Sequence, residues 1–600
     1  MELISKLIFN RPLAALILFL VSFALYSPSL KSDFVWDDVE MITKSNISYD
    51  TSSIIYYIIP DKIENKQERY YRPVVYLSWV ADNGIWGVSP FGYHLSSLIF
   101  HSVSVVLFYF FAVLMLREFD AAGIEAAAFL SAFLFALHPM HVESVSWVAG
   151  RSDVLCALFL FLASISHILS YRISWFLALA GSSFLLSLFS KEVAIVFPIL
   201  VLVFDLMNRR LFNWSNIPKY AVYLGVILLY LYLRTKAFDI PEVDGGIVIG
   251  GLEHAPSGEE HASKAALYLG LIKILLGSYL VYLDKLVLPF GFDPFITAVP
   301  RETPFLISSI VLLSVLAVLS FISIKMREKV TAFCIFWILI TLAPSALIAI
   351  VSITPTPLAE RYLFIPSAGY CLLIGYWIVE AGSRARLKRI ARGLGLLLIV
   401  LFGLTAYKGQ RIWKDDLTLW RDISLKSPYH PLPHSNYGLA LSNTGELDEA
   451  IKEYKIALSP EMKDSPRGLA VTANNLALVY LDKEEYEKAE MWFRRALEYD
   501  PSYGKTYYHM GLIYYINGEL TGSADSYREA ERYVKEALKR YRYYGRANLL
   551  LAKIYLGTGE ADKAVKEARA AIDIGLPENL LKEARDILEI DNGRSYQEPQ

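Results

Sequence analysis

The sequence predicts an all-α protein built from a polytopic membrane domain followed by a tetratricopeptide-repeat (TPR) α-solenoid. Of the 600 residues, 54% are hydrophobic and the mean hydropathy is +0.37, whereas soluble globular proteins are about 45–50% apolar. The apolar excess lies in successive stretches of bilayer-spanning length that end near Lys408. The rest of the chain is charged and tyrosine-rich, and its small residues recur with a period of roughly 34 residues.

These observations divide the chain into three parts. Residues 1–408 are the predicted membrane domain, 409–431 a linker with a capping helix, and 432–592 about four TPR repeats. The first apolar run follows Lys6 and Arg11, as in a signal peptide. Because the run lacks a small-x-small cleavage site, we expect it to be an uncleaved anchor.

Charge and cysteine content exclude several classes of function. The formal net charge is −2, so nothing global indicates a nucleic-acid partner. The three cysteines, Cys156, Cys334 and Cys371, all fall inside apolar stretches, where small buried residues are expected. Neither a disulfide framework nor a CxxC metal motif is present.

A helical membrane crossing needs about 20 predominantly apolar residues, and about eleven segments qualify. The predicted crossings are 12–30, 94–116, 126–142, 154–170, 174–190, 193–207, 218–235, 304–324, 330–351, 362–381 and 393–408. Segment 264–288 is ambiguous, because it is apolar but carries Lys264, Lys273, Asp284 and Lys285.

Basic loops decide the orientation of these crossings. The clusters are Arg209, Arg210 and Lys219; Lys325, Arg327 and Lys329; and Arg384, Arg386, Lys388, Arg389 and Arg392. The positive-inside rule places all three clusters in the cytoplasm only if 264–288 lies at the interface or re-enters without crossing. We therefore predict a cytoplasmic N terminus and a TPR domain on the outer side.

This topology gathers ionisable side chains at the outer helix ends, as in an outward-facing active site. They are Asp37, Asp38, Arg72, His138, His141, Glu143, Arg151, Asp153, Lys191, Glu192, Glu360 and Arg361. The adjacent acids Asp37 and Asp38 are the leading candidates, since an ionisable pair so near a bilayer is costly unless it faces a cavity or water. The alternative is two solvated loop acids.

The TPR prediction rests on small residues in the first helix of each unit, which let paired helices approach. The aligned positions are Tyr437-Gly438, Leu476-Ala477, Met510-Gly511 and Leu551-Ala552. Pro501 closes the second unit where the consensus places a proline, and 415–426 is the expected capping helix. Such solenoids present concave surfaces to extended peptides or partner proteins.

Short motifs in a fixed order give the membrane part a family resemblance. They are Asp-Phe-Val-Trp-Asp-Asp at 33–38, Tyr-Arg-Pro at 71–73, Gly-Tyr-His-Leu at 92–95 with His101, Leu-His-Pro-Met-His-Val-Glu-Ser-Val at 137–145, Gly-Arg-Ser-Asp-Val-Leu at 150–155, Ser-Lys-Glu at 190–192, Phe-Asp-Pro-Phe at 292–295, Ala-Glu-Arg-Tyr-Leu-Phe-Ile-Pro at 359–366 and Arg-Ile-Trp-Lys-Asp-Asp-Leu-Thr-Leu-Trp at 411–420. Followed by TPR units, these motifs resemble the transmembrane-and-TPR-containing (TMTC-like) family, GT-C glycosyltransferases related to protein O-mannosyltransferases. The repeat array is short for that family and the membrane loops are compact, which suggests a prokaryotic relative.

The resemblance implies inverting transfer of a mannose-like hexose from a polyprenyl-phosphate donor to serine or threonine of a protein. A hydroxyl nucleophile needs a carboxylate to accept its proton, and Asp37 or Asp38 is the expected base, with Asp37 favoured by its motif position. The leaving phosphate needs cations to stabilise its charge. The candidates are Arg72, Arg151, Lys191 and Arg361, and Glu360 is expected to orient Arg361.

Supporting roles are expected for His94, His138, His141, Glu143, Asp153, Glu192 and Glu360. The histidines could hold a metal with Glu143 or Asp153, but inter-helix hydrogen bonding is favoured, and no cofactor or metal is predicted. Arg151 and Asp153 could instead form one interfacial ion pair. The acidic Gly-rich loop 237–263 is interpreted as a solvated charge run.

The main hypothesis is therefore an integral membrane glycosyltransferase, in a prokaryotic plasma membrane or in the endoplasmic reticulum. Its predicted partners are membrane lipids, the lipid-linked sugar and an acceptor protein held by the outer or lumenal TPR groove. The alternatives are a transferase that acts on a glycan or glycolipid, and a non-catalytic TPR scaffold. A transporter is disfavoured, because the ionisable residues gather at one face and hardly any mark a path at the midplane.

Overall fold

The computed structural model describes residues 10–43, 71–211, 213–237, 264–351, 356–541 and 544–592. Loop residues 238–263, interpreted above as part of a charge run, lie outside this part of the chain. The described residues form helices and one isolated bridge between Ile296 and Leu358, without a strand. The predicted all-α class is thus confirmed. The chain divides into two compact units, Met1–Leu419 and Trp420–Gln600.

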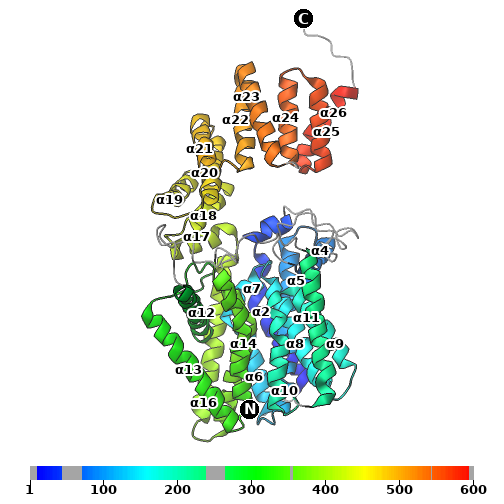
Figure 1. Ribbon diagram of the computed structural model, residues 1–600, viewed down its shortest axis with the longest axis vertical. Coiled ribbons are helices and arrows are strands. Elements are labelled where there is room, and N and C mark those ends of the chain that lie inside the picture. Colours follow the sequence, from blue (N-terminus) through cyan, green and yellow to red (C-terminus); the bar gives the residue numbers. More distant parts are fainter. Residues whose placement is uncertain are drawn as a thin grey trace. The chain divides into compact units, whose positions relative to one another are not determined.

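The first unit is a bundle of long apolar helices (Figure 1). They are α2 (Arg11–Tyr26), α4 (Pro73–Trp86), α5 (Pro90–Glu118), α6 (Ile124–Leu137), α7 (Val142–Ser146), α8 (Arg151–Leu169), α9 (Phe176–Ser190), α10 (Phe197–Met207), α11 (Ile217–Ala237), α12 (Lys264–Val287), α13 (Thr303–Lys325), α14 (Lys329–Val351), α15 (Phe364–Ser383) and α16 (Lys388–Gly409). Short helical turns at Ser27–Lys31, Val39–Thr43, Pro139–His141, Glu192–Val196, Trp214–Asn216, Glu360–Leu363 and Gln410–Trp413 connect or extend them.

Each predicted crossing overlaps a helix of this unit, although 126–142 continues beyond α6 into the turn Pro139–His141. Among the described residues, eight helices are long and apolar enough to span a membrane. The pair Ile124–Leu137 and Pro139–Ser146, bent by 54°, would make nine. Helices α9 and α10 are shorter, with 15 and 11 residues. The protein is a multi-pass membrane protein, but length and hydropathy alone support fewer crossings than the sequence predicted.

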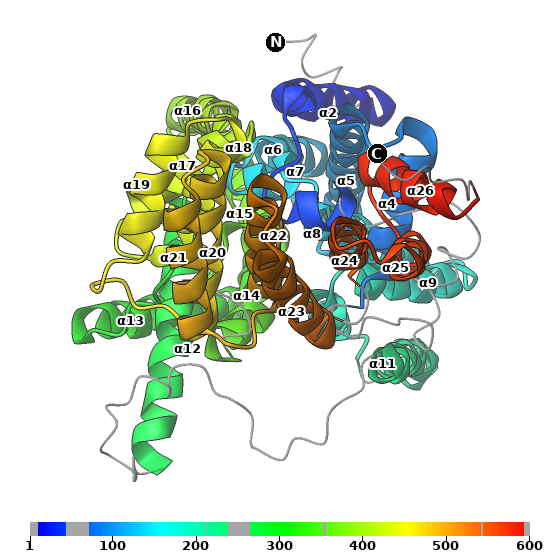
Figure 2. The same ribbon diagram turned by 90° about the horizontal axis from the view of Figure 1, so that it is seen from above.

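Helix α12 covers the ambiguous segment and runs across the bundle. It is seen nearly end-on in Figure 1, beside the upright α14, and along its length in Figure 2. It is not among the helices that satisfy the length and composition of a span. Both observations agree with the prediction that 264–288 does not cross.

Two of the three basic loops lie at the same end of the bundle. Arg210, which follows α10, pairs with Glu118 at the end of α5, 2.5 Å away, and Lys329 donates to Asn208 at 3.3 Å. Helix α5 has 29 residues, and a helix rises about 1.5 Å per residue, so its first turn at Pro90 lies on the order of 40 Å away.

The second unit consists of antiparallel helix pairs, preceded by α17 (Asp416–Lys426), which covers the predicted capping helix 415–426. The helices are α18 (Pro431–Asn443), α19 (Leu447–Ala457), α20 (Pro466–Asp482), α21 (Tyr486–Tyr499), α22 (Gly504–Thr521), α23 (Ala524–Arg540), α24 (Gly545–Gly557), α25 (Ala561–Ile574) and α26 (Glu578–Asn592). Each predicted repeat coincides with one pair, from α18 and α19 to α24 and α25.

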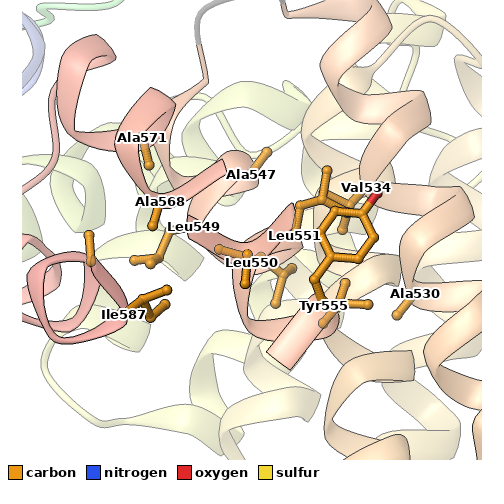
Figure 3. Packing of buried hydrophobic residues seen from close by; sticks show 14 of the residues in the cluster. Ala530, Val534, Ala547, Leu549, Leu550, Leu551, Tyr555, Ala568, Ala571 and Ile587 are labelled. Carbon is orange, nitrogen blue, oxygen red and sulfur yellow. The ribbon is translucent and has the colours of Figure 1, made fainter. Parts of the chain in front are cut away.

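Small residues bring the paired helices together, as the repeat pattern predicts. A Cβ atom on Gly511 would lie 2.5 Å from the Val534 side chain, and one on Gly438 would lie 3.0 Å from the Tyr454 ring. Larger residues would therefore separate these helices. Figure 3 shows the same principle farther along the unit, where leucines of α24 and Tyr555 pack among alanines of α23 and α25.

Candidate active site

Asp38 is a buried structural residue. Its side chain is fully buried and accepts hydrogen bonds from the backbone N–H groups of Ala149 (2.7 Å) and Val35 (3.3 Å). Burial raises the pKa of Asp38 to about 8, although these N–H groups oppose the rise. The carboxyl group therefore joins the segment 33–38 to the turn before α8.

Of the two adjacent acids Asp37 and Asp38, Asp37 is the one whose carboxylate is available to a substrate. Its side chain is half-buried, and no hydrogen bond or ion pair joins it to any residue that the structure describes. Burial raises the pKa of Asp37 above its ordinary value of 3.8; nearby Arg361 opposes this rise and Glu40 adds to it. A half-buried carboxylate with a raised pKa, close to a cation, has the properties of a general base.

The residue before Asp37 has an unusual backbone. Trp36 adopts φ +55°, in the left-handed region, which costs a bulky residue about 1–2 kcal/mol. Its N–H donates to the Asp416 carboxylate at 2.8 Å, and its ring stacks on Trp147 at 5.2 Å. Such strain persists only where surrounding contacts impose it, and it concentrates at functional sites.

Arg361 lies near enough to Asp37 to affect its charge, and it is held by Glu143. Its guanidinium forms a short ion pair with the Glu143 carboxylate, which also accepts the Arg361 backbone N–H at 2.9 Å. The expectation that Glu360 orients Arg361 is wrong. Glu360 is buried and binds Lys285 of α12 at 2.6 Å and the Asp293 N–H at 2.8 Å. These two partners orient the Glu360 carboxylate toward the loop that follows α12.

Two further predicted cations belong to the same charged group as Arg361. Lys191 pairs with Asp153 at 2.6 Å, and both side chains are buried. Burial lowers the pKa of Lys191, while Asp153 opposes that change. The Tyr362 ring contacts both cations, with its centre 4.8 Å from the Lys191 ammonium and 5.1 Å from the Arg361 guanidinium carbon.

Arg72 joins this charged group through Glu192. The two side chains form a two-pronged ion pair, with Arg72 Nη2 2.8 Å from Glu192 Oε1 and Nε 3.2 Å from Oε2. Burial disfavours the Glu192 carboxylate, but Arg72, the Glu192 backbone N–H and Lys191 together outweigh burial and lower the pKa of Glu192 to about 2. We call Arg72, Lys191 and Arg361, with Glu192, Asp153 and Glu143, the ionic cluster.

Arg151 lies outside this cluster. It is fully buried and pairs with Asp82 of α4 at 2.6 Å. Its remaining donors bind Ser97 (3.0 Å), Ser78 (3.0 Å) and the Tyr93 carbonyl (2.6 Å). The alternative of an Arg151–Asp153 ion pair is wrong, because each residue pairs elsewhere. The geometry favours a packing role for Arg151 between α4, α5 and α8, although its predicted phosphate contact stays a prediction.

The predicted histidines lie in the core among aromatic rings. His141 shares a hydrogen bond with Ser367 of α15 at 2.7 Å, which is the favoured inter-helix bond, and its ring lies 4.2 Å from Phe364. His138 accepts the Met140 N–H at 3.3 Å, and His94 lies 3.4 Å from the Asp33 carbonyl. In the described ranges, no three histidine, cysteine or acidic side chains are placed to hold a metal ion.

Sequence reasoning did not single out Tyr362, Asp82 or Asp416. Tyr362 and Asp416 lie within the motifs at 359–366 and 411–420, so their motif membership was the available signal. No such signal was available for Asp82. An isolated acid in a helix looks the same in sequence whether it is solvated or buried, and only the structure shows its ion pair with Arg151.

The fold and the site define a multi-pass helical membrane protein with a TPR unit and an ionic cluster at one bundle end. Two tetratricopeptide families match the second unit, "TPR repeat" over residues 477–518 and "Tetratricopeptide repeat" over 524–576, which confirms the repeats.

Curated relatives of this chain are protein O-mannosyl-transferases, which confirms the resemblance. One from Caenorhabditis elegans is 26% identical over 466 residues, covering 73% of this chain and 61% of the relative. Tmtc3 of Drosophila melanogaster is 22% identical, covering 78% of this chain and 58% of the relative. TMTC1 of Homo sapiens is 26% identical, covering 77% and 56%. The chain thus spans 56–61% of the length of these relatives.

Proposed function

We propose that this protein is a GT-C-type membrane glycosyltransferase. It moves a mannose-like hexose from a polyprenyl-phosphate donor to serine or threonine of an acceptor protein, with inversion, on the non-cytoplasmic face. The observation that carries this proposal is Asp37, a half-buried carboxylate that has no hydrogen bond to a described residue, whose pKa is raised by burial and which lies near Arg361. The names of the curated relatives support the reaction class.

Asp37 is the base in a single displacement. The acceptor oxygen attacks the anomeric carbon opposite the phosphate, and the bond from that carbon to the phosphate oxygen breaks. Asp37 takes the hydroxyl proton while the lipid phosphate leaves with the electron pair. Asp38 does not compete for this role, since its carboxyl group is fully buried and already binds two backbone N–H groups.

Arg361 is the favoured phosphate contact among the four predicted cations. It uses Nη1 for Glu143, while its Nε and Nη2 have no hydrogen bond within the described part of the chain. The side chain is 14% exposed, so a ligand can reach it. Lys191 and Arg72 add positive charge, and in a site with little water such cations stabilise a leaving phosphate strongly.

The TPR unit is proposed to recruit the acceptor on the outer or lumenal side. Within the membrane unit, the Asp33 N–H donates to the Lys414 carbonyl at 2.9 Å. The candidate base therefore lies at the bundle end where the chain leaves toward the repeats. The basic loops around Arg210 and Lys329 lie at the other end, in agreement with the positive-inside rule.

Substitution of Asp37, with substitution of Asp33 as a control, tests the assignment of Asp37 as the base. With radiolabelled polyprenyl-phosphate mannose and membranes that contain the protein, we expect Asp37→Asn to lower transfer at least about 100-fold, the scale of a lost general base. Asp33→Asn, which changes an exposed acid four residues earlier, is the matched control and should transfer normally. Full activity of Asp37→Asn would overturn the proposal.

The same assay separates the alternatives. Label in lipid or glycan, but none in protein, would indicate a glycan or glycolipid acceptor. Binding of partner proteins without transfer by the wild type would indicate a scaffold.

A further inference from the structure

The segment after the last membrane helix contacts the loop that carries Asp37. Two backbone groups of that loop bind this segment: the Asp33 N–H donates to the Lys414 carbonyl at 2.9 Å, and the Trp36 N–H donates to Asp416 Oδ1 at 2.8 Å. The partners of the second bond are 380 residues apart in sequence. The contact is therefore a tertiary one that the proposed chemistry does not yet use.

The Asp416 hydrogen bond acts on the strained residue of the loop. Trp36 has φ +55°, a conformation that L-residues with a side chain disfavour. Rotation about its N–Cα bond toward an ordinary negative φ would redirect the chain that follows, beginning with Asp37. A carboxylate acceptor forms a charge-assisted bond with the N–H, roughly twice as strong as a neutral one, and fixes the peptide plane on the N-terminal side of that rotation.

Stacked indoles support the same conformation. The Trp36 ring lies 5.2 Å from Trp147 with 20° between their planes, and Trp147 lies 5.7 Å from Trp413 with 23°. Trp413 is 1% exposed, so the stack ends in the core. Segment 413–416 thus supplies both the end of the stack and the acceptor for the Trp36 N–H.

Asp37 lies between two fixed neighbours. On its C-terminal side, Asp38 is fastened by the Ala149 N–H at 2.7 Å, and on its N-terminal side Trp36 is fastened by Asp416. The Asp37 carboxylate itself has no bond to a described residue. The backbone on either side therefore helps to set its position.

We propose that Asp416 is a positioning residue. By binding the Trp36 N–H it helps to keep Trp36 in the left-handed conformation, and this conformation places the Asp37 carboxylate. The inference rests on the proposed function of Asp37 as the base. Asp416 touches neither sugar nor phosphate in this proposal. It acts by keeping the base in register with the acceptor hydroxyl.

The neighbouring aspartate provides a matched control. Asp415 binds the Thr418 N–H at 2.8 Å and caps α17, so Asp415→Asn makes the same change of charge and size as Asp416→Asn at a residue that does not bind the Trp36 N–H. With purified full-length protein, radiolabelled polyprenyl-phosphate mannose and a serine/threonine peptide, we expect Asp416→Ala to lower kcat at least tenfold. The donor KM should stay within twofold, because the donor contacts are intact.

Asp416→Asn keeps an acceptor oxygen and should recover part of the activity, to within two- to fivefold of the wild-type kcat. Asp416→Asn can also replace Asp416→Ala in this test if the alanine variant fails to fold. A kcat of Asp416→Asn equal to that of Asp415→Asn overturns the inference, as does a loss confined to KM. If Asp37→Asn is itself fully active, the proposed base fails first, and the two failures are thereby distinguished.

A labelling experiment tests the placement without using activity. The native Cys156, Cys334 and Cys371 are buried, so Asp37→Cys introduces an accessible thiol. We expect its rate of reaction with a membrane-impermeant maleimide to change at least threefold when Asp416→Ala is added. Addition of Asp415→Asn should leave the rate unchanged. An unchanged rate with Asp416→Ala would overturn the inference.

Discussion

Glu143 holds Arg361 at two points, since its carboxylate pairs with the guanidinium and also accepts the Arg361 backbone N–H at 2.9 Å. Glu143 is 2% exposed, whereas Arg361 is 14% exposed. The buried acid thus fixes both the chain and the side chain of a cation that remains within reach of a ligand. The guanidinium also lies 5.4 Å from the Trp147 ring, which makes it part of the same structure as the Asp37 loop.

Glu143→Gln should therefore impair both stability and transfer. Removing one partner of a buried ion pair typically costs about 3–5 kcal/mol, because the other charge is left uncompensated. We expect a lower unfolding temperature and at least about a tenfold loss of sugar transfer. Glu380→Gln is the control, since Glu380 and Arg384 form an exposed pair at 3.0 Å. Exposed pairs contribute about 0–1 kcal/mol, and equal losses in the two variants would contradict the prediction.

The buried pair of Lys191 and Asp153 should show strong thermodynamic coupling. Asp153→Leu and Lys191→Met each leave a buried charge and should destabilise the protein, whereas the double variant should recover part of the loss. A double-mutant cycle from thermal unfolding should give a coupling energy of about 1–3 kcal/mol. Transfer should not recover with stability, because the double variant still lacks the proposed cation. A coupling energy near zero would show that the pair is not formed.

Protonation of Glu192 should lower the stability of the protein at acidic pH. The pKa of Glu192 is lowered to about 2 from an ordinary value of 4.5, because Arg72, with the Glu192 backbone N–H and Lys191, outweighs the effect of burial. The folded state then binds fewer protons than the unfolded state between these values. The stabilisation is present above about pH 4.5 and is lost as the pH falls toward 2. Unfolding measured over this range should show a smaller loss for Glu192→Gln than for the wild type, and identical slopes would refute the assignment.

Asp38 should make stability depend on pH in the opposite direction to Glu192. Its pKa is raised by burial from 3.8 to about 8, so the folded state binds more protons than the unfolded state between these values. The contribution is fully present below about pH 4 and declines as the pH rises through about 8. Asp38→Asn should flatten this part of the pH profile. It should also lower stability by about 1–3 kcal/mol, because an amide cannot accept from both backbone N–H groups. An unchanged profile would argue against a protonated buried Asp38.

Asp37 should be visible in the pH dependence of transfer. Burial raises its pKa, so the carboxylate needed as a base forms only above the ordinary aspartate value of 3.8. We expect kcat/KM to rise with pH along an acidic limb whose midpoint lies above that value. Arg361→Gln removes the cation that opposes the rise, so it should move the midpoint to higher pH. No movement would mean that Arg361 does not act on Asp37.

Much of this protein follows from local pattern. Apolar stretches of spanning length predicted the membrane helices, and small residues such as Gly438 and Gly511 predicted where repeat helices meet. These features are local, because helix length and the spacing of small residues depend only on neighbours in sequence. The clustering of Arg72, Lys191 and Arg361 was also accessible, since topology alone puts several helix ends on one face.

The sequence by itself therefore determined the architecture and the set of charged residues at one end of the bundle. Only the tertiary structure decided the pairings: Arg361 with Glu143 rather than Glu360, Arg151 with Asp82 rather than Asp153, and the Trp36 N–H with Asp416. The tertiary structure also distinguished the buried Asp38 from the available Asp37. The physical reason is that an ion pair depends on distance in space, and these partners are 218, 69 and 380 residues apart along the chain.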